Sequence, residues 1–181
     1  MPDSDQPRIL QHTQPADVAP SLRKQIIDCW VAVTNNGGAA GFPFPPIKFH
    51  HAAGATDALL TTLTPAQSRI LTAHIDGTLA GWVHLHRDPN RLIAHWGSVH
   101  HLQTHPTHRR QGIGAALMQK LHQVARDELH LDQLHLAARG GAGLEHFYTR
   151  LGWREIGRWP AKLKLAPGDL RDEILMILNP L

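Results

Sequence analysis

The chain has 181 residues, 42% of them hydrophobic and 18% charged, which is the length and composition of one soluble globular domain. Its formal net charge of +3 comes from scattered basic residues and not from a basic tract, which argues against nucleic-acid binding. Because no apolar run is long enough to span a bilayer and no signal-peptide pattern opens the chain, we expect a cytoplasmic protein with no membrane contact.

Taken in chain order, the hydrophobic pattern predicts an antiparallel meander that passes into a strand–helix–strand unit. The expected elements are a flexible tail at 1–7, a strand at 8–13, helices at 18–34 and 56–63, strands at 69–75, 78–86 and 93–104, a helix from about Gly112 to Glu128, a strand at 133–139, a helix at 143–152, and closing strands at 153–159 and 172–178. This order predicts a single α/β (α+β) domain over 1–181, with a mixed, mostly antiparallel sheet and helices on both faces.

Two connections in the first half carry strong local signals. Asp76-Gly77 lies between two alternating apolar runs, which predicts a β-hairpin. The segment NNGGAAGFPFPP, at 35–46, combines helix-stopping residues with prolines, so we expect a shaped loop in which Phe42 and Phe44 supply packing.

The single cysteine, Cys29, falls in an apolar helical segment and is expected to be a core residue rather than a nucleophile.

The stretch THRRQGIGAALM, at 107–118, places two glycines where a helix begins. Glycine costs roughly 1 kcal/mol relative to alanine in a helix interior, so helix stability does not explain Gly112 and Gly114. The first turn of a helix has N–H groups without intrahelical partners and a partial positive charge, and glycines let a bulky anion approach them. With Arg109 and Arg110 beside it, this stretch indicates a cradle for a diphosphate, although a loop end with solvated arginines would give the same pattern.

A second signal lies about thirty residues further on, in FYTRLGW at 147–153. Phe147 and Leu151 are four residues apart on one helix face, which is typical of core positions. Tyr148 is rotated from that face by about one hundred degrees, so it is expected to face a cleft or to be a half-buried tyrosine.

Together, LQTHPTHRRQGIGAALM (102–118) and FYTRLGW resemble the GNAT superfamily of N-acetyltransferases, which move an acetyl group from acetyl-CoA to an amine. The GGAAGF loop, the PNRL turn and the tail FYTRLGWREIGRWP are similar to the tabtoxin-resistance branch, whose acceptors are small molecules. The resemblance implies the GNAT fold, with a splayed central sheet, and acetyl-CoA as co-substrate without a metal. It also implies a small-molecule amine as partner and leaves room for a homodimer.

The resemblance also assigns the cofactor contacts and the acid. The splayed strand corresponds to Ser98–Thr104, and a bulge there would free an N–H for the thioester oxygen. Tyr148 matches the acid that protonates the departing thiolate. The implied cofactor-binding residues are Leu102, Gln103, Thr104, Arg109, Arg110, Gln111, Gly112, Ile113, Gly114 and Ala115.

The general base is left open by the sequence. Many relatives have Glu where this chain has Ser98, and serine cannot act as a base unaided. His100 is expected to project from the same sheet face as Ser98, with His101 on the opposite face unless a bulge intervenes. An ordinary histidine pKa near 6.5 suits proton abstraction, so His100 and a water relay are both candidates.

Two competing interpretations follow from the same residues. His84, His86, His100, His101, His105 and His108 invite a metal site, but no cysteine or carboxylate accompanies them and no spacing repeats, so no metal is expected. The missing glutamate favours a catalytically silent acetyl-CoA-binding sensor or scaffold, against which Tyr148 argues. By resemblance, the loop at 35–46 and the first two helices form the acceptor pocket, whose low acidic charge predicts a small, zwitterionic or amide-bearing acceptor.

Overall fold

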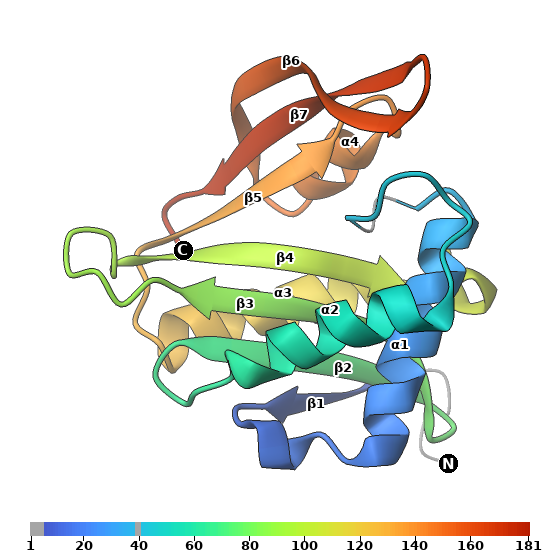
Figure 1. Ribbon diagram of the computed structural model, residues 1–181. Coiled ribbons are helices and arrows are strands. Elements are labelled where there is room, and N and C mark those ends of the chain that lie inside the picture. Colours follow the sequence, from blue (N-terminus) through green and yellow to red (C-terminus); the bar gives the residue numbers. More distant parts are fainter. Residues whose placement is uncertain (1–5, 39–40) are drawn as a thin grey trace.

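The computed structural model describes residues 6–38 and 41–181, so most of the expected tail at 1–7 lies outside the described residues. A mixed sheet forms the centre of the molecule, with the strand order β1-β2-β3-β4-β5-β7-β6 (Figure 1). The strands are β1 Arg8–His12, β2 Ser68–Ile75, β3 Thr78–Arg87, β4 Trp96–Thr104, β5 Gln133–Arg139, β6 Arg154–Ala166 and β7 Asp169–Leu178. The α-helices are α1 Pro20–Asn35, α2 Phe49–Thr61, α3 Ile113–Asp127 and α4 Leu144–Thr149, with short 3-10 turns at Pro15–Asp17 and Pro106–His108.

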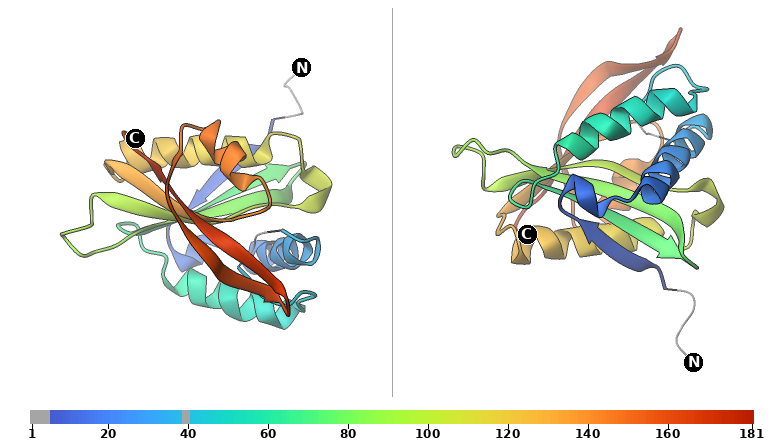
Figure 2. Two further views of the ribbon diagram at one scale, coloured as in Figure 1. Left: turned by 90° about the horizontal axis from the view of Figure 1, so that it is seen from above. Right: turned by 60° about the horizontal axis from the view of Figure 1, so that its bottom comes forward.

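Helices cover both faces of the sheet, as predicted (Figure 2). Successive side chains of β3 point to opposite faces, so both faces of the sheet are apolar. Trp82 joins the core beneath α1 and α2, while Val83 joins the core beneath α3. In α3 the side chains of Leu117 and Leu121 are fully buried on one stripe, which matches the predicted apolar face. The predicted fold class is therefore confirmed.

Two predicted boundaries are each wrong by seven residues. The helix expected at 56–63 begins seven residues earlier, at Phe49, where the Lys48 N–H donates to His51 Nδ1 and so caps the first turn. The strand expected at 153–159 continues to Ala166, although Pro160 would ordinarily end it. The register of β6 against β7 shifts between Trp159 and Leu163, and Ala161 takes a positive φ of 51°, so a bulge absorbs the proline.

The strands β4 and β5 diverge at the centre of the sheet, and this divergence positions the site (Figure 1). They are parallel neighbours only at Trp96↔Gln133, Gly97↔Leu134 and Ser98↔His135, while the other strand pairs among the described residues are antiparallel. Beyond Ser98, the edge of β4 that faces β5 has no strand partner among the described residues. The predicted splayed strand is present.

A bulge lies on β4 shortly after the strands part. His84 pairs with His100 whereas Trp82 pairs with Gln103, so His101 and Leu102 together oppose Val83. His101 has a positive φ of 57°, which places it in the left-handed region. The bulge that we expected on this strand is therefore found at His101–Leu102, beside the gap between β4 and β5.

Candidate active site

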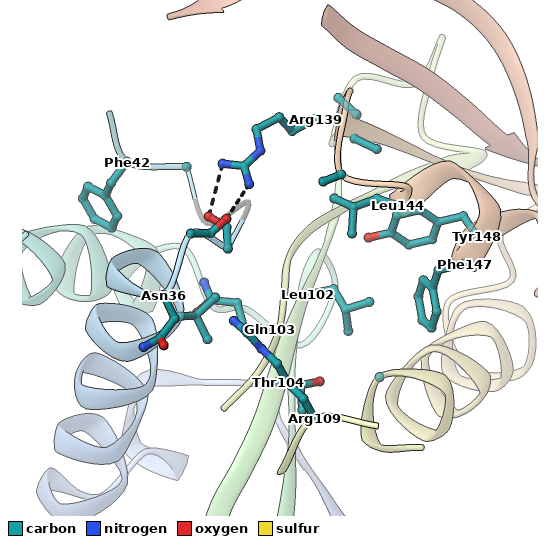
Figure 3. Close-up of a pocket in the computed structure, with 18 of the residues that line it drawn as sticks. Asn36, Phe42, Leu102, Gln103, Thr104, Arg109, Arg139, Leu144, Phe147 and Tyr148 are labelled. Atoms are coloured by element: carbon teal, nitrogen blue, oxygen red, sulfur yellow. Dashed lines mark hydrogen bonds between the residues drawn. The ribbon is translucent and has the colours of Figure 1, made fainter. Parts of the chain in front are cut away.

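A pocket of about 920 Å³ fills the gap between β4 and β5 (Figure 3). Its walls come from the end of β4, the start of α3, the end of β5 and α4 on one side. The loop after α1 and the far end of the β6–β7 hairpin close the other side. One continuous space thus joins the segment that begins α3 to the loop at 35–46.

The start of α3 forms one end of this pocket. Gly112 is the N-cap and adopts a left-handed conformation with φ of 78°, which glycine takes without strain. A Cβ at Gly112 would meet no atom within 4 Å, so the space in front of the helix is open. A Cβ at Gly114 would lie 3.4 Å from Phe147 Cζ, so a larger side chain would fill the space between α3 and α4. The unpartnered N–H groups of the first helical turn therefore face room for an anion.

The arginines before α3 are exposed and line the same end of the pocket. The charge of Arg109 also opposes the rise in pKa of the Cys29 thiol, which shows that its guanidinium lies near α1. Arg110 adopts a positive φ of 64°, as part of the turn that delivers the chain into the helix. Gln111 is exposed, donates to the Thr107 carbonyl at 3.4 Å, and does not line the pocket.

The three residues at the end of β4 line the floor of the pocket. Leu102, Gln103 and Thr104 lie beyond the last β4–β5 pair, so their main-chain groups on that edge are available to an extended ligand. Gln103 is only 2% exposed, and neither polar atom of its side-chain amide has a partner among the described residues. Buried amide atoms without partners are rare, so a ligand or an ordered water is expected to satisfy them. These features fit the extended amide-bearing arm of acetyl-CoA.

Tyr148 borders the pocket from α4. Its ring is 9% exposed and packs edge to face on Phe147, with the ring centroids 5.1 Å apart. In Figure 3 its hydroxyl points into the open space opposite Leu102. Burial raises the pKa of Tyr148 to about 12, so its hydroxyl keeps its proton at neutral pH. Of the two expectations for this residue, facing a cleft is the one that the structure supports.

Ser98 and His100 share the sheet face that α1 and α2 cover, as predicted, but neither lines the pocket. The His100 ring lies 5.8 Å from that of His84, between centroids. Desolvation lowers the pKa of His100, and the charge of His86 adds to this, although solvent moderates the effect because His100 is exposed.

The bulge turns the neighbouring histidine onto this face as well. The His101 ring packs 4.7 Å from the Trp30 ring and 5.8 Å from the Trp82 ring. Its pKa is lowered to about 4, chiefly by burial and then by the charge of His100. A base with so low a pKa accepts protons weakly, so we assign His101 a packing role.

The other end of the pocket is closed by contacts between distant segments. Arg139, at the end of β5, donates from Nη2 to the Gly37 carbonyl at 2.6 Å and from Nη1 to the Gly38 carbonyl at 3.4 Å (Figure 3). The Phe44 N–H donates to the Leu165 carbonyl of β6 at 2.8 Å. The loop thus lies over the gap, as the resemblance implied. Among the described residues α2 adds nothing to the pocket wall, contrary to our expectation for the second helix.

Other expectations concern chemistry outside this pocket. Cys29 is buried, and burial raises the pKa of its thiol to about 12, which confirms a core residue. Within 6–38 and 41–181, no three His, Cys, Asp or Glu side chains are placed to hold a metal ion. The helices of this described part are too short or too polar to cross a bilayer.

Sequence reasoning missed Arg139 and Lys164, which both line the pocket at the end away from α3. Arg139 ends a strand predicted correctly at 133–139, but its position opposite the loop depends on the divergence of β4 and β5. Lys164 lies on the part of β6 after Pro160, which was not predicted to be a strand. No local motif marks either residue.

A glycine-started helix, an open strand edge and a buried tyrosine around one pocket define a protein that binds a coenzyme A thioester and transfers its acyl group. Residues 21–153 match the family model described as the acetyltransferase (GNAT) family, and the chain belongs to this family. The protein is accordingly an acyl-CoA-dependent N-acetyltransferase, and its co-substrate is acetyl-CoA. The narrower likeness to the tabtoxin-resistance branch stays a prediction.

Solved structures show the same fold at low sequence identity. The yncA protein of Salmonella typhimurium, solved with its cofactor acetyl-CoA, has a TM-score of 0.72 and 16% identity, covering 97% of this chain and 94% of its own. A ribosomal-protein-alanine N-acetyltransferase from Brucella melitensis has a TM-score of 0.68 and 18% identity over 95% of this chain and 99% of its own. A nourseothricin acetyltransferase has a TM-score of 0.54 and 26% identity over 64% of this chain and 66% of its own. A search of curated proteins gives no match.

Proposed function

We propose that this chain transfers an acetyl group from acetyl-CoA to the primary amine of a small-molecule acceptor, by direct attack in a ternary complex. The observation that carries this proposal is the single pocket that joins the start of α3, the open edge of β4 and Tyr148 to the loop at 35–46. Cofactor and acceptor can occupy such a space together, which direct attack requires.

A small acceptor is favoured by the way the pocket is closed. Arg139 and Leu165 both hold the loop after α1 over this end of the pocket, which favours an acceptor smaller than a folded polypeptide. The similar structures do not decide this point, because one is named for nourseothricin and another for a ribosomal-protein alanine. These contacts across the acceptor end therefore support the small-molecule proposal.

Acetyl-CoA supplies an activated acyl carbon, and the chain supplies binding, orientation and a proton. The N–H groups at the start of α3, with Arg109 and Arg110, would hold the diphosphate. The main chain of Leu102–Thr104 would hold the extended arm, and the bulge would donate an N–H to the thioester oxygen as charge develops there. As the new C–N bond forms and the C–S bond breaks, Tyr148 would donate its hydroxyl proton to the departing sulfur. The second proton lost by the acceptor nitrogen would pass to water and return Tyr148 to its neutral form.

The acceptor ammonium, with a pKa near 10.4 for an ordinary amine, must lose a proton before its nitrogen can attack. We propose His100 as the base. Because its ring lies outside the pocket wall, it would accept this proton through water. Ser98, on the same strand face two residues earlier, would orient that water rather than act as a base itself.

The sequence left open a catalytically silent acetyl-CoA sensor or scaffold, because Ser98 stands in the place of a glutamate, but the family match favours the enzyme. The two functions separate in one experiment. A panel of amines and peptides is incubated with acetyl-CoA, and release of free CoA thiol is followed. We expect thiol release with small amines only. A preference for peptides would contradict the small-molecule acceptor, and acetyl-CoA binding without turnover of any amine would support the silent module.

We also propose a cytoplasmic location and a homodimer. The free, buried thiol of Cys29 fits a reducing compartment. The arm formed by β6 and β7 exposes Ile156, Trp159 and Leu170, which supports a dimer contact there. Light scattering coupled to gel filtration measures the mass directly, and a monomer at micromolar concentration would contradict the dimer.

A further inference from the structure

The charged residues that line the pocket are unequal in sign. Five are basic and one is acidic, namely Arg109, Arg110, Arg139, Arg150, Lys164 and Glu173. A pocket with such an excess of positive charge attracts anions and raises their local concentration.

Three of the five cations lie at the cofactor end. Arg109 and Arg110 precede α3, and Arg150 follows α4, whose Phe147 borders the start of α3. The phosphate groups of acetyl-CoA would compensate their charge. These arginines therefore carry no information about the acceptor.

The remaining two cations lie at the acceptor end, where acetyl-CoA brings no phosphate. Arg139 is half-buried, and its hydrogen bonds in the described residues go to the neutral carbonyls of Gly37 and Gly38. Lys164 is exposed on β6 near Leu165, the residue that holds the loop. Neither has a carboxylate within salt-bridge distance among the described residues.

The one acidic residue does not remove this excess. Glu173 is the cross-strand neighbour of Arg139, yet its carboxylate is paired with Lys162. Desolvation and then the nearby charge of Arg171 lower the pKa of Arg139, while the charge of Asp169 opposes this. A guanidinium has five N–H donors, so donors beyond the two bonded to the loop remain for a ligand.

We propose that the acceptor carries a carboxylate on the same small molecule as its amine, and that Arg139 binds this carboxylate while the charge of Lys164 in the same pocket adds to the attraction. The proposal rests on the proposed function and narrows its substrate class. In Figure 3 the guanidinium of Arg139 and the hydroxyl of Tyr148 border the same open space from opposite sides. An acceptor anchored at Arg139 therefore extends its amine toward the reacting end. The apolar walls supplied by Phe42 and Leu163 suit the carbon skeleton between the two groups.

The test compares amino acids with their own carboxamides as acceptors, at saturating acetyl-CoA. The two members of each pair differ only in the carboxylate. Rates are expressed per unprotonated amine, because the carboxamide lowers the pKa of the neighbouring ammonium. For the best acceptor we expect kcat/KM of the amino acid to exceed that of its carboxamide at least about tenfold, the range of one charge-assisted hydrogen bond.

Variants then assign the preference to the two cations. Lys164→Gln should reduce the preference severalfold through acceptor KM, while the matched surface change Lys24→Gln, in the exposed Lys24–Asp28 pair of α1, should leave it unchanged. Arg139→Lys keeps the charge and should retain part of the preference, whereas Arg139→Gln should remove it. Both Arg139 variants lose the fork that holds Gly37 and Gly38, so the difference between them reports the charge.

The outcomes separate the two proposals. Equal use of acids and carboxamides by the wild type would overturn the carboxylate proposal and leave the small-molecule acetyltransferase standing. A preference that survives in both Lys164→Gln and Arg139→Gln would overturn the assignment to these cations. If no amine in the panel is acetylated although acetyl-CoA raises the melting temperature, the proposed function itself is overturned, and the carboxylate proposal with it.

Discussion

The two ends of the pocket are built in different ways. The end that we propose for the cofactor presents main-chain groups of Leu102–Thr104 and of the first turn of α3, which are sixteen or fewer residues apart in the chain. The acceptor end uses side chains and loop carbonyls from α1, β5 and β6, with more than one hundred residues between Gly37 and Arg139. The cofactor end can therefore be encoded by a short motif, whereas the acceptor end exists only once the chain has folded.

This contrast implies that substitutions at the two ends fail differently. At the cofactor end, a change that blocks the main chain should abolish binding, because no other group replaces those N–H donors. At the acceptor end, each side chain contributes separately, so a single substitution should change the choice of acceptor and leave acetyl-CoA binding intact. The predictions below test this contrast in order of expected effect.

Gly112→Asp should abolish acetyl-CoA binding. The substitution places bulk and negative charge where the diphosphate would lie, in front of α3. A ligand that binds only the folded state stabilises it by about 2.7 kcal/mol at a hundred times its dissociation constant, and the variant should lose this gain. The melting temperature with and without acetyl-CoA measures the effect.

Gly77→Asp is the matched control. Gly77 has φ of 76° against 78° for Gly112, and a Cβ at either position would meet nothing within 4 Å. The two variants therefore introduce similar backbone strain, but Gly77 lies in the β2–β3 hairpin, away from the pocket. A normal acetyl-CoA shift in Gly112→Asp would contradict the cradle at α3.

Tyr148→Phe should lower turnover while leaving acetyl-CoA affinity and the melting temperature nearly unchanged. It removes the proton source but keeps the ring that packs on Phe147. General acid catalysis contributes about 10²- to 10⁴-fold, so we expect at least about a hundredfold loss of kcat near neutral pH.

The pH dependence of this loss checks its cause. With the pKa of Tyr148 raised to about 12, the wild-type hydroxyl stays protonated throughout the usual assay range, so it adds no alkaline limb there. The loss of kcat should shrink as pH rises. As pH approaches the pKa of the CoA thiol, the sulfur can depart as a free thiolate, so the proton from Tyr148 matters less. A loss that is equal at every pH would instead indicate altered cofactor positioning, and nearly full activity would return Tyr148 to a packing role.

His100→Gln should lower kcat about tenfold, less than loss of a direct base, because the proton passes through water. Since the pKa of His100 is lowered, the wild-type ring is neutral at neutral pH and the rate should fall only as pH drops below about 6.5. The variant should lose this acid limb. The profile of kcat against pH decides whether the base is His100 or a water relay that does not use it. If His100→Gln keeps the acid limb, His100 is not the base.

The smallest expected effect is on stability in acid, and it arises on the sheet face that α1 and α2 cover. Burial holds the pKa of His84 at about 3 and that of His101 at about 4, while an unfolded histidine titrates near 6.5. The unfolded chain therefore binds more protons below about pH 6.5, and the free energy of unfolding falls as pH decreases. Between about pH 7 and pH 5.5 the loss is about 1 kcal/mol for each such histidine.

Urea unfolding at these two pH values measures the loss. His84→Gln should show a smaller fall between them than the wild type, whatever its absolute stability. His50→Gln, a change of an exposed histidine on α2, should fall as the wild type does. An identical fall in His84→Gln and the wild type would show that the buried ring is not the source.

The sequence predicted the fold wherever one short segment carries the whole signal. The strand at 133–139 and the hairpin at Asp76-Gly77 are as expected, because alternation and turn chemistry are local. The start of α2 was missed because two histidines and Gly54 weaken its helical pattern, which tertiary packing of Ala52 restores.

The same reasoning explains which part of the site was predictable. Nine of the ten predicted cofactor residues line the pocket, and Gln111 is the exception. Tyr148 also lines the pocket. Arg139 and Lys164 were not predicted, because the loop, the end of β5 and the bulged half of β6 meet only through the divergence of the sheet. His100 was placed on the correct face, but its distance from the pocket depends on the bulge at His101.

The seam between β4 and β5 has a mechanical consequence. Only three residue pairs of β4 and β5 join the four-stranded part of the sheet to the β5-β7-β6 part. We therefore expect β4 and β5 to separate more easily than the other neighbouring strands. An extended ligand arm that forms hydrogen bonds to both β4 and β5 would hold these two strands together. Amide hydrogen exchange at residues 102–104 and 137–139 should then slow markedly on addition of acetyl-CoA, while the amides shared by β2 and β3 exchange at an unchanged rate.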